Sequence, residues 1–293
     1  MTPYKVFSYI FFIISLHSNA YANNIEGDMN NAIQKLNDLY TSNPDACNIY
    51  ANLITSPIDC SGVIIHGIED GQVHAWVPDQ TDARKAVSFS YLRSDIPTNL
   101  LFEGSGFVYD QTVRNNDATK LTFYCFYPFD AFSDLATEHP SNSHGCGLPD
   151  TVYASNNNGE FASCPDAQVA NADDFINKYL ENGTPKAIIT DECSFSANNA
   201  QSFASVLNVQ KKTASPYWNE LITSTWNEEQ AKKLPIIAFF YLIGDSKGHN
   251  QALEHQRDYC NSYQIFMPVV KLDLSKKNAD AFTGDIGDQQ PCP

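Results

Sequence analysis

The sequence predicts an α+β fold in a single domain, and three observations support this prediction. Short runs rich in β-branched and aromatic residues alternate with segments of helical periodicity, and strands are expected at both ends of the order. No proline-rich or low-complexity linker divides the chain beyond residue 22. The roughly 270 residues that follow are enough to bury a substantial core. We therefore expect one domain over residues 23–293, with a loop-rich insertion at about residues 128–165 where Ser, Asn, Gly and Pro accumulate.

The period of the apolar positions locates the individual elements. Met29, Ile33, Leu36 and Tyr40 recur at helical spacing, which predicts an amphipathic helix over residues 27–40. Further helices are expected over residues 173–182, 198–207 and 249–263. Strands are expected over residues 62–68, 86–93, 121–127, 234–243 and 265–272. The run Gly104-Ser105-Gly106 predicts only a tight turn.

The N-terminus has the pattern of a secretory signal peptide over residues 1–22. One basic residue, Lys5, precedes an uncharged apolar run from Val6 to Leu16, and a small-x-small site closes the segment at Ala22. The apolar run is shorter than the roughly 20 residues that span a bilayer, so cleavage after Ala22 is favoured over a retained anchor. We expect a secreted protein without a membrane partner.

The charge balance excludes some classes of partner. The chain has 18 basic and 34 acidic side chains and a formal net charge of -16. Nucleic acids and anionic lipids bind to clusters of Lys and Arg, so neither is expected as a partner.

Eight cysteines, all located after residue 22, predict up to four disulfides in an oxidising compartment. Pairing of Cys47 with Cys60 and of Cys146 with Cys164 would close the shortest loops, but the sequence leaves the connectivity open. No Cys-x-x-Cys pair or closely spaced Cys/His quartet is present, so no metal is expected.

Common catalytic motifs are missing from the sequence. It contains no Gly-x-Ser-x-Gly elbow, Walker loop, His-Glu-x-x-His helix or dinucleotide fingerprint. Four polar residues stand out in apolar surroundings: His66, Ser88, Ser90 and Glu220. A buried imidazole or carboxylate is costly unless it is paired, so each of these residues requires an explanation.

Six segments together resemble the halovibrin family of secreted bacterial proteins, whose members are described as NAD glycohydrolases or ADP-ribosyltransferases. The segments are CSGVIIHGI, HAWVPD, VSFSYLRSD, ECSFSANNAQSFASVL, WNELITSTW and LPIIAFFY, in this order between Cys60 and Leu272. The resemblance implies a mixed, mainly antiparallel sheet like that of the ADP-ribosyltransferase fold. It also implies that NAD is the substrate and that no other cofactor is needed.

The ADP-ribosyltransferase superfamily implies a role for each candidate residue. Its members order an Arg or His on a first strand, a Ser-rich or Tyr-bearing second strand, and a Glu before two or three apolar residues. His66, the pair Ser88 and Ser90, and Glu220 match this order, although His66 and Ser88 are closer than usual and an insertion precedes Glu220. Glu220 is then the catalytic residue, and the residues expected to contact NAD are His66, Ser88, Ser90, Tyr91, Arg93 and Trp218.

Each of these roles has a structural alternative. His66 is equally well explained as a core histidine with satisfied hydrogen bonds, and the two serines as partners of strand backbone. Glu220 would then be a solvated helix residue, and Arg93 would form an ordinary surface ion pair with Asp95.

Hydrolysis is the predicted reaction, giving nicotinamide and ADP-ribose. Superfamily toxins that modify arginine or asparagine commonly carry Glu or Gln two residues before the catalytic Glu, and Trp218 occupies that position here. A protein ADP-ribosyltransferase with a host or competitor protein as acceptor is one alternative. A non-catalytic adhesive module is the other, favoured by the cysteine-bearing Ser/Asn segment within the insertion.

Overall fold

The structure is a computed structural model, and it describes most of the chain beyond residue 24. The described residues are 25–42, 57–69, 86–98, 100–113, 115–129, 169, 171–181, 184–185, 194–197, 200–213, 218–289 and 291–292. The predicted signal peptide and most of the predicted insertion lie outside them, as do Cys47, Cys146, Cys164 and Cys193. The single-domain boundaries therefore stay a prediction.

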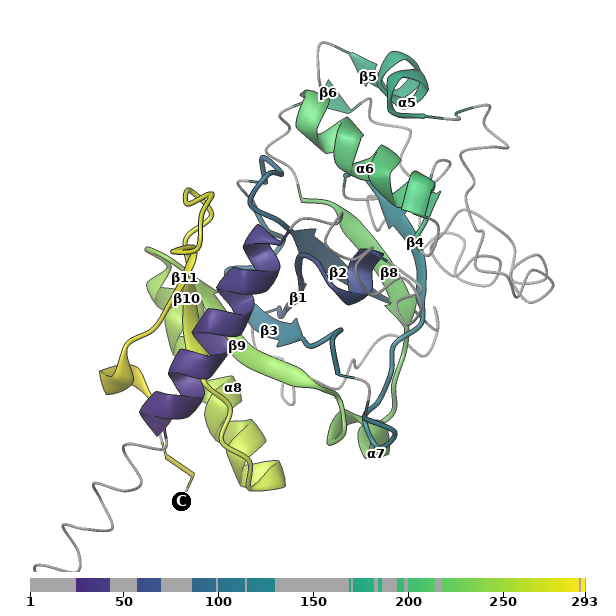
Figure 1. The fold of residues 1–293 in the computed structure, drawn as a ribbon. Helices are drawn as coiled ribbons and strands as arrows, with labels where there is room; N and C mark the ends of the chain where they lie inside the picture. The colour runs from purple at the N-terminus through teal and green to yellow at the C-terminus, as the bar shows by residue number, and fades with distance from the viewer. Residues whose placement is uncertain are drawn as a thin grey trace, which may run out of the picture.

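Within the described residues, nine strands form one sheet in the order β11-β10-β9-β3-β1-β2-β8-β4-β7 (Figure 1). Their bounds are β1 Val63–Gly67, β2 Ala86–Leu92, β3 Ser105–Tyr109, β4 Phe123–Tyr127, β7 Phe195–Ser196, β8 Glu220–Ser224, β9 Ile236–Leu242, β10 Val269–Leu272 and β11 Phe282–Thr283. Only β9 and β10 pair in parallel, and the other neighbours are antiparallel. A small second sheet joins β5 Leu180–Glu181 to β6 Thr184–Pro185. The predicted α+β class with a mixed, mainly antiparallel sheet is confirmed.

Helices lie on both faces of the main sheet. The helix over residues 25–41, called the N-terminal helix below, lies across one face of the sheet (Figure 1). Its Leu36 and Tyr40 belong to one buried cluster with Ile65 of β1 and Phe240 of β9. The opposite face is covered by α6 Ala200–Thr213 near β4 and β7 and by α8 Ser246–Tyr263 near β9 and β3. α5 Ala172–Tyr179 packs on α6, and α7 Glu228–Ala231 is a single capped turn before β9. The described core therefore has three layers, with the sheet in the middle.

Two of the strands in the centre of the sheet were not predicted. Of the Gly-Ser-Gly run that predicts a turn, Gly104 lies in a bend, whereas Ser105 and Gly106 begin β3, in which every residue is buried. A Cβ atom on Gly106 would lie 1.9 Å from the backbone oxygen of His66, so glycine is required by the close approach of β1 and not by a turn. The second missed strand is β8, which begins at Glu220.

All four described cysteines are disulfide-bonded. Cys260, near the end of α8, is joined to Cys292, with 5.5 Å between their Cα atoms. This pair is consistent with the predicted disulfide-rich protein and ties the C-terminal segment to α8. Among the described helices, none has the length and apolar character required to cross a membrane.

Candidate active site

Three neighbouring strands bring a polar row to one face of the sheet. Glu220, the first residue of β8, pairs with Tyr127 of β4. On the other side of β8, Phe89 of β2 pairs with Leu221, and the antiparallel register therefore sets Ser90 beside Glu220. Directly opposite residues of an antiparallel pair point to the same face, so Ser90, Glu220 and Tyr127 form a row across the three strands.

Ser88 lies on the same face, two residues before Ser90 along β2. It is opposite Ile222 of β8 and is exposed, whereas Ser90 and Glu220 are half-buried. Glu220 lies on a strand, so its interpretation as a helix residue is wrong. The structure thus places Ser88, Ser90 and Glu220 together on one face of the sheet, beside the cluster packed under the N-terminal helix.

An aromatic pair stands beside the polar row. The ring of Trp218, just before β8, meets the ring of Phe102 edge-on, with 6.0 Å between their centroids. Phe102 is 56% exposed, and its neighbour Leu101 packs against the cluster that contains Ile65. Since Ile65 pairs with Ser90, the loop that carries Phe102 lies on the same side of the sheet as the polar row.

His66 lies on the opposite face from Ser90. It pairs with Phe107, and its ring lies between the rings of Phe89 and Phe107, at centroid distances of 5.2 and 5.3 Å. Successive residues of a strand point to opposite faces, so the face of Phe89 is not the face of Ser90. Burial lowers the pKa of His66, although the hydrogen bond between its Nδ1 and the carbonyl oxygen of Ser88 opposes this shift. The structure agrees with the alternative interpretation in that the Nδ1 hydrogen bond of His66 is satisfied within the protein, although the residue is half-buried and not part of the buried core.

Tyr91 is also directed away from the polar row. Its ring is fully buried against Phe126 and Phe203, with centroid distances of 5.8 and 5.2 Å. Its hydroxyl lies 3.1 Å from the hydroxyl of Ser61, and burial raises its pKa. The structure does not place this ring where a ligand on the Ser90 face would stack.

Arg93 forms an ion pair with Asp95 through two hydrogen bonds. Its Nε and one terminal nitrogen each lie 2.5 Å from a carboxylate oxygen of Asp95, and Lys211 lies 2.5 Å from the same carboxylate. Burial opposes ionisation of Asp95, but the hydrogen bonds from Arg93 and Lys211 lower its pKa to about 2. The guanidinium is 5% exposed, so most of its surface already faces the protein. The ion pair that served as the alternative interpretation is therefore present.

Sequence reasoning missed two residues beside the polar row, Phe102 and Asn219. The exposure of Phe102 depends on how the loop over residues 100–104 crosses the sheet, which no local pattern reports. Asn219 is fully buried, and its backbone oxygen accepts a hydrogen bond of 3.3 Å from the hydroxyl of Ser90. An asparagine between an aromatic residue and a carboxylate carries no signal for burial in the sequence.

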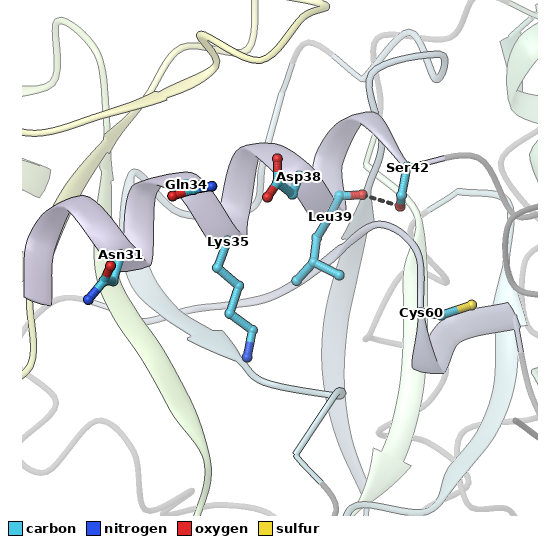
Figure 2. Close-up of a pocket in the computed structure, with 7 residues that line it drawn as sticks. All are labelled: Asn31, Gln34, Lys35, Asp38, Leu39, Ser42 and Cys60. Carbon is cyan, nitrogen blue, oxygen red and sulfur yellow. Dashed lines mark hydrogen bonds between the residues drawn. The ribbon is translucent and has the colours of Figure 1, made fainter. Parts of the chain in front are cut away.

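A pocket of about 370 Å³ lies away from the polar row, along the N-terminal helix. Figure 2 shows its lining residues on the helix, on the turn after it and at the end of the short helix η2 Pro57–Asp59. They are Asn31, Gln34, Lys35, Asp38, Leu39, Ser42 and Cys60. None of the predicted site residues lines this pocket.

The described residues contain no group of three or more His, Cys, Asp or Glu side chains arranged to hold a metal ion. Comparisons of the chain with protein-family models, with curated proteins and with solved structures return no match.

Proposed function

We propose that this protein is a secreted NAD glycohydrolase built on a sheet like that of the ADP-ribosyltransferases. The observation that carries the proposal is the row in which Ser90 lies beside Glu220, with Ser88 on the same face. The segments that carry the two serines and Glu220 are far apart in sequence, yet they form the neighbouring strands β2 and β8, and β1 lies on the other side of β2. The adjacency of β2 and β8 supports the proposal, because the serines and Glu220 can act on one substrate only if these two strands meet.

The proposed reaction breaks the bond between the nicotinamide nitrogen and C1′ of the ribose. The bonding electrons leave with nicotinamide, and a water oxygen bonds to C1′, so that NAD and water give nicotinamide, ADP-ribose and a proton. Positive charge develops on the ribose ring in an oxocarbenium-like transition state. The carboxylate of Glu220 would stabilise this charge and accept a hydrogen bond from the ribose 2′-hydroxyl. Ser88 and Ser90 would position the ribose and the nicotinamide amide.

Water is the proposed acceptor, and the surroundings of Trp218 favour it over a protein side chain. Trp218 occupies the position where transferases of the superfamily commonly carry Glu or Gln. Its ring packs against Phe102, so the site presents an apolar contact there and not a carboxylate or amide that orients an acceptor.

The proposal does not include contacts of NAD with His66, Tyr91 or Arg93. The first two lie on the opposite face of the sheet, and the guanidinium of Arg93 is buried in its ion pair with Asp95. These three residues are better explained by their packing and hydrogen bonds within the protein.

Three measurements test the proposal. The purified protein lacking residues 1–22 should release nicotinamide from NAD, as detected by chromatography, and failure to release it would contradict hydrolysis. Calorimetric titration with NAD separates an enzyme from an adhesive module, since the module should bind no NAD. Export is tested by the intact mass of the protein in the culture medium, which should correspond to a chain beginning at Asn23.

A further inference from the structure

The fully buried side chain of Asn219 takes the place of a backbone group in the sheet. Its Oδ1 accepts a hydrogen bond of 2.7 Å from the backbone N–H of Tyr91, and its Nδ2 donates one of 2.7 Å to the backbone oxygen of the same residue. Nδ2 also donates to Oε1 of Gln210 at 3.1 Å. A carboxamide has the same donor and acceptor as a peptide group, so this side chain extends the pairing of β2 and β8 by one rung beyond Glu220.

We propose that Asn219 is a positioning residue, whose carboxamide holds Glu220 beside Ser90. Asn219 adjoins Glu220 in the chain. Its side chain is hydrogen-bonded to the backbone of Tyr91, which follows Ser90, and its backbone oxygen accepts a hydrogen bond from the hydroxyl of Ser90. Ser90 and Glu220 are therefore both attached to this one buried residue. The inference rests on the proposed function, because a positioning role requires that Glu220 acts in chemistry.

The same bonding pattern occurs at two other places in the sheet. Asn37 accepts from the N–H of Phe282 at 2.9 Å and donates to its oxygen at 2.8 Å. Gln289 accepts from the N–H of Val269 at 2.9 Å and donates to its oxygen at 3.0 Å. These two contacts secure β11 and β10, at the far end of the sheet from β8. The fold thus contains matched carboxamides, of which only Asn219 adjoins the polar row.

The substitution Asn219→Asp tests the inference with little change in shape. A protonated carboxyl at this position still accepts from the N–H of Tyr91 and donates to its oxygen. An ionised carboxylate has no hydrogen to donate and would face that oxygen at close range. Because the position is fully buried, desolvation raises the pKa of the introduced carboxyl, and such groups reach pKa values of about 8 to 9. The pairing should hold at low pH and fail as pH rises.

The kinetic readout is kcat and KM for NAD between about pH 5 and about pH 9. We expect kcat of Asn219→Asp to approach that of the parent protein at the acidic end and to fall about 10- to 100-fold below it at the alkaline end, with a smaller change in KM. Circular dichroism at each pH restricts the comparison to folded protein. A folded variant whose kcat follows the parent at every pH would overturn the inference.

Asn37→Asp is the matched control, because it places the same carboxyl in the same bonding pattern away from Glu220. It should lower the melting temperature as pH rises without lowering kcat of the folded protein. An equal, pH-dependent loss of kcat in this control would show that the effect is general destabilisation, and the positioning role would be rejected.

Failure of the proposed function would be recognised separately. If the parent protein releases no nicotinamide, hydrolysis is excluded, and the positioning of a catalytic Glu220 is overturned with it. The pairing itself remains measurable by hydrogen exchange at the Tyr91 amide. If the parent protein is active, loss of protection of the Tyr91 amide in Asn219→Asp at high pH but not at low pH supports the inference. Equal protection in the parent and the variant at every pH overturns it.

Discussion

The imidazole of His66 donates a hydrogen bond through Nδ1 to the backbone oxygen of Ser88, 2.7 Å away, because a carbonyl oxygen can only accept. The ring also fills the space between Phe89 and Phe107. We therefore predict that His66→Ala lowers the free energy of unfolding by about 2 kcal/mol. Nicotinamide release per folded molecule should stay within about threefold of the parent value. Urea unfolding and steady-state kinetics on the same preparation check both parts, and a loss of turnover without a loss of stability would return His66 to the active site.

Substitution of the proposed catalytic carboxylate should have the opposite profile. Glu220→Gln keeps the shape of the side chain but removes the charge that faces the oxocarbenium ion. We expect kcat to fall about 100- to 1000-fold, equivalent to about 3 to 4 kcal/mol, with the melting temperature and NAD affinity nearly unchanged. If the variant hydrolyses NAD within a few-fold of the parent rate, another group stabilises the transition state.

The two serines should contribute to binding and rate by smaller factors. Removal of one positioning hydrogen bond is worth about 1 kcal/mol, so Ser90→Ala and Ser88→Ala should each lower kcat/KM about fivefold. Ser275→Ala is a suitable control, because its hydroxyl bonds only locally to Asp273 after β10. Unchanged kcat/KM in both serine variants would indicate that their hydroxyls do not contact NAD.

The sequence was sufficient to predict the elements whose burial pattern is local. The β-branched and aromatic run over residues 86–93 predicts a strand, and the structure has β2 there, at Ala86–Leu92. β3 was not predicted because the glycine at position 106 is required by the close approach of the His66 backbone, and His66 lies 40 positions earlier in the chain. Which face His66 occupies was likewise unpredictable, since a shift of one residue in strand register exchanges the two faces.

A buried histidine on α8 makes stability depend on acidity. His255 on α8 is 5% exposed, and its Nε2 has no hydrogen-bond partner among the described residues. Burial lowers its pKa to about 4, although the charge of Asp258 opposes this shift. In the unfolded chain the pKa of the His255 imidazole is about 6.5, so the unfolded state binds this proton more strongly than the folded state. The stabilisation is present above about pH 6.5 and is lost as pH falls towards about 4.

The predicted size of this loss is about 3 kcal/mol, because the pKa values of His255 in the unfolded and folded states, about 6.5 and about 4, differ by about 2.5 and each pKa unit is worth about 1.4 kcal/mol. His255→Leu should remove most of it, and His66, whose pKa is also lowered, should contribute in the same direction. Denaturant unfolding at intervals between about pH 7 and about pH 4 measures the slope. An identical slope in the parent protein and in His255→Leu would assign the acid sensitivity to other groups.

The hydrogen bonds between Asn37 and Phe282 join residues that are 245 positions apart in the chain. Closing so large a loop is entropically unfavourable until much of the intervening chain is ordered. A ribosome delivers Asn37 well before Phe282, so these two hydrogen bonds cannot form until β11 has been synthesised, whereas the packing of the N-terminal helix against Ile65 of β1 needs only residues made much earlier. A truncated chain that lacks residues 282–293 should therefore lose the attachment of the N-terminal helix to β11 while keeping its packing against β1.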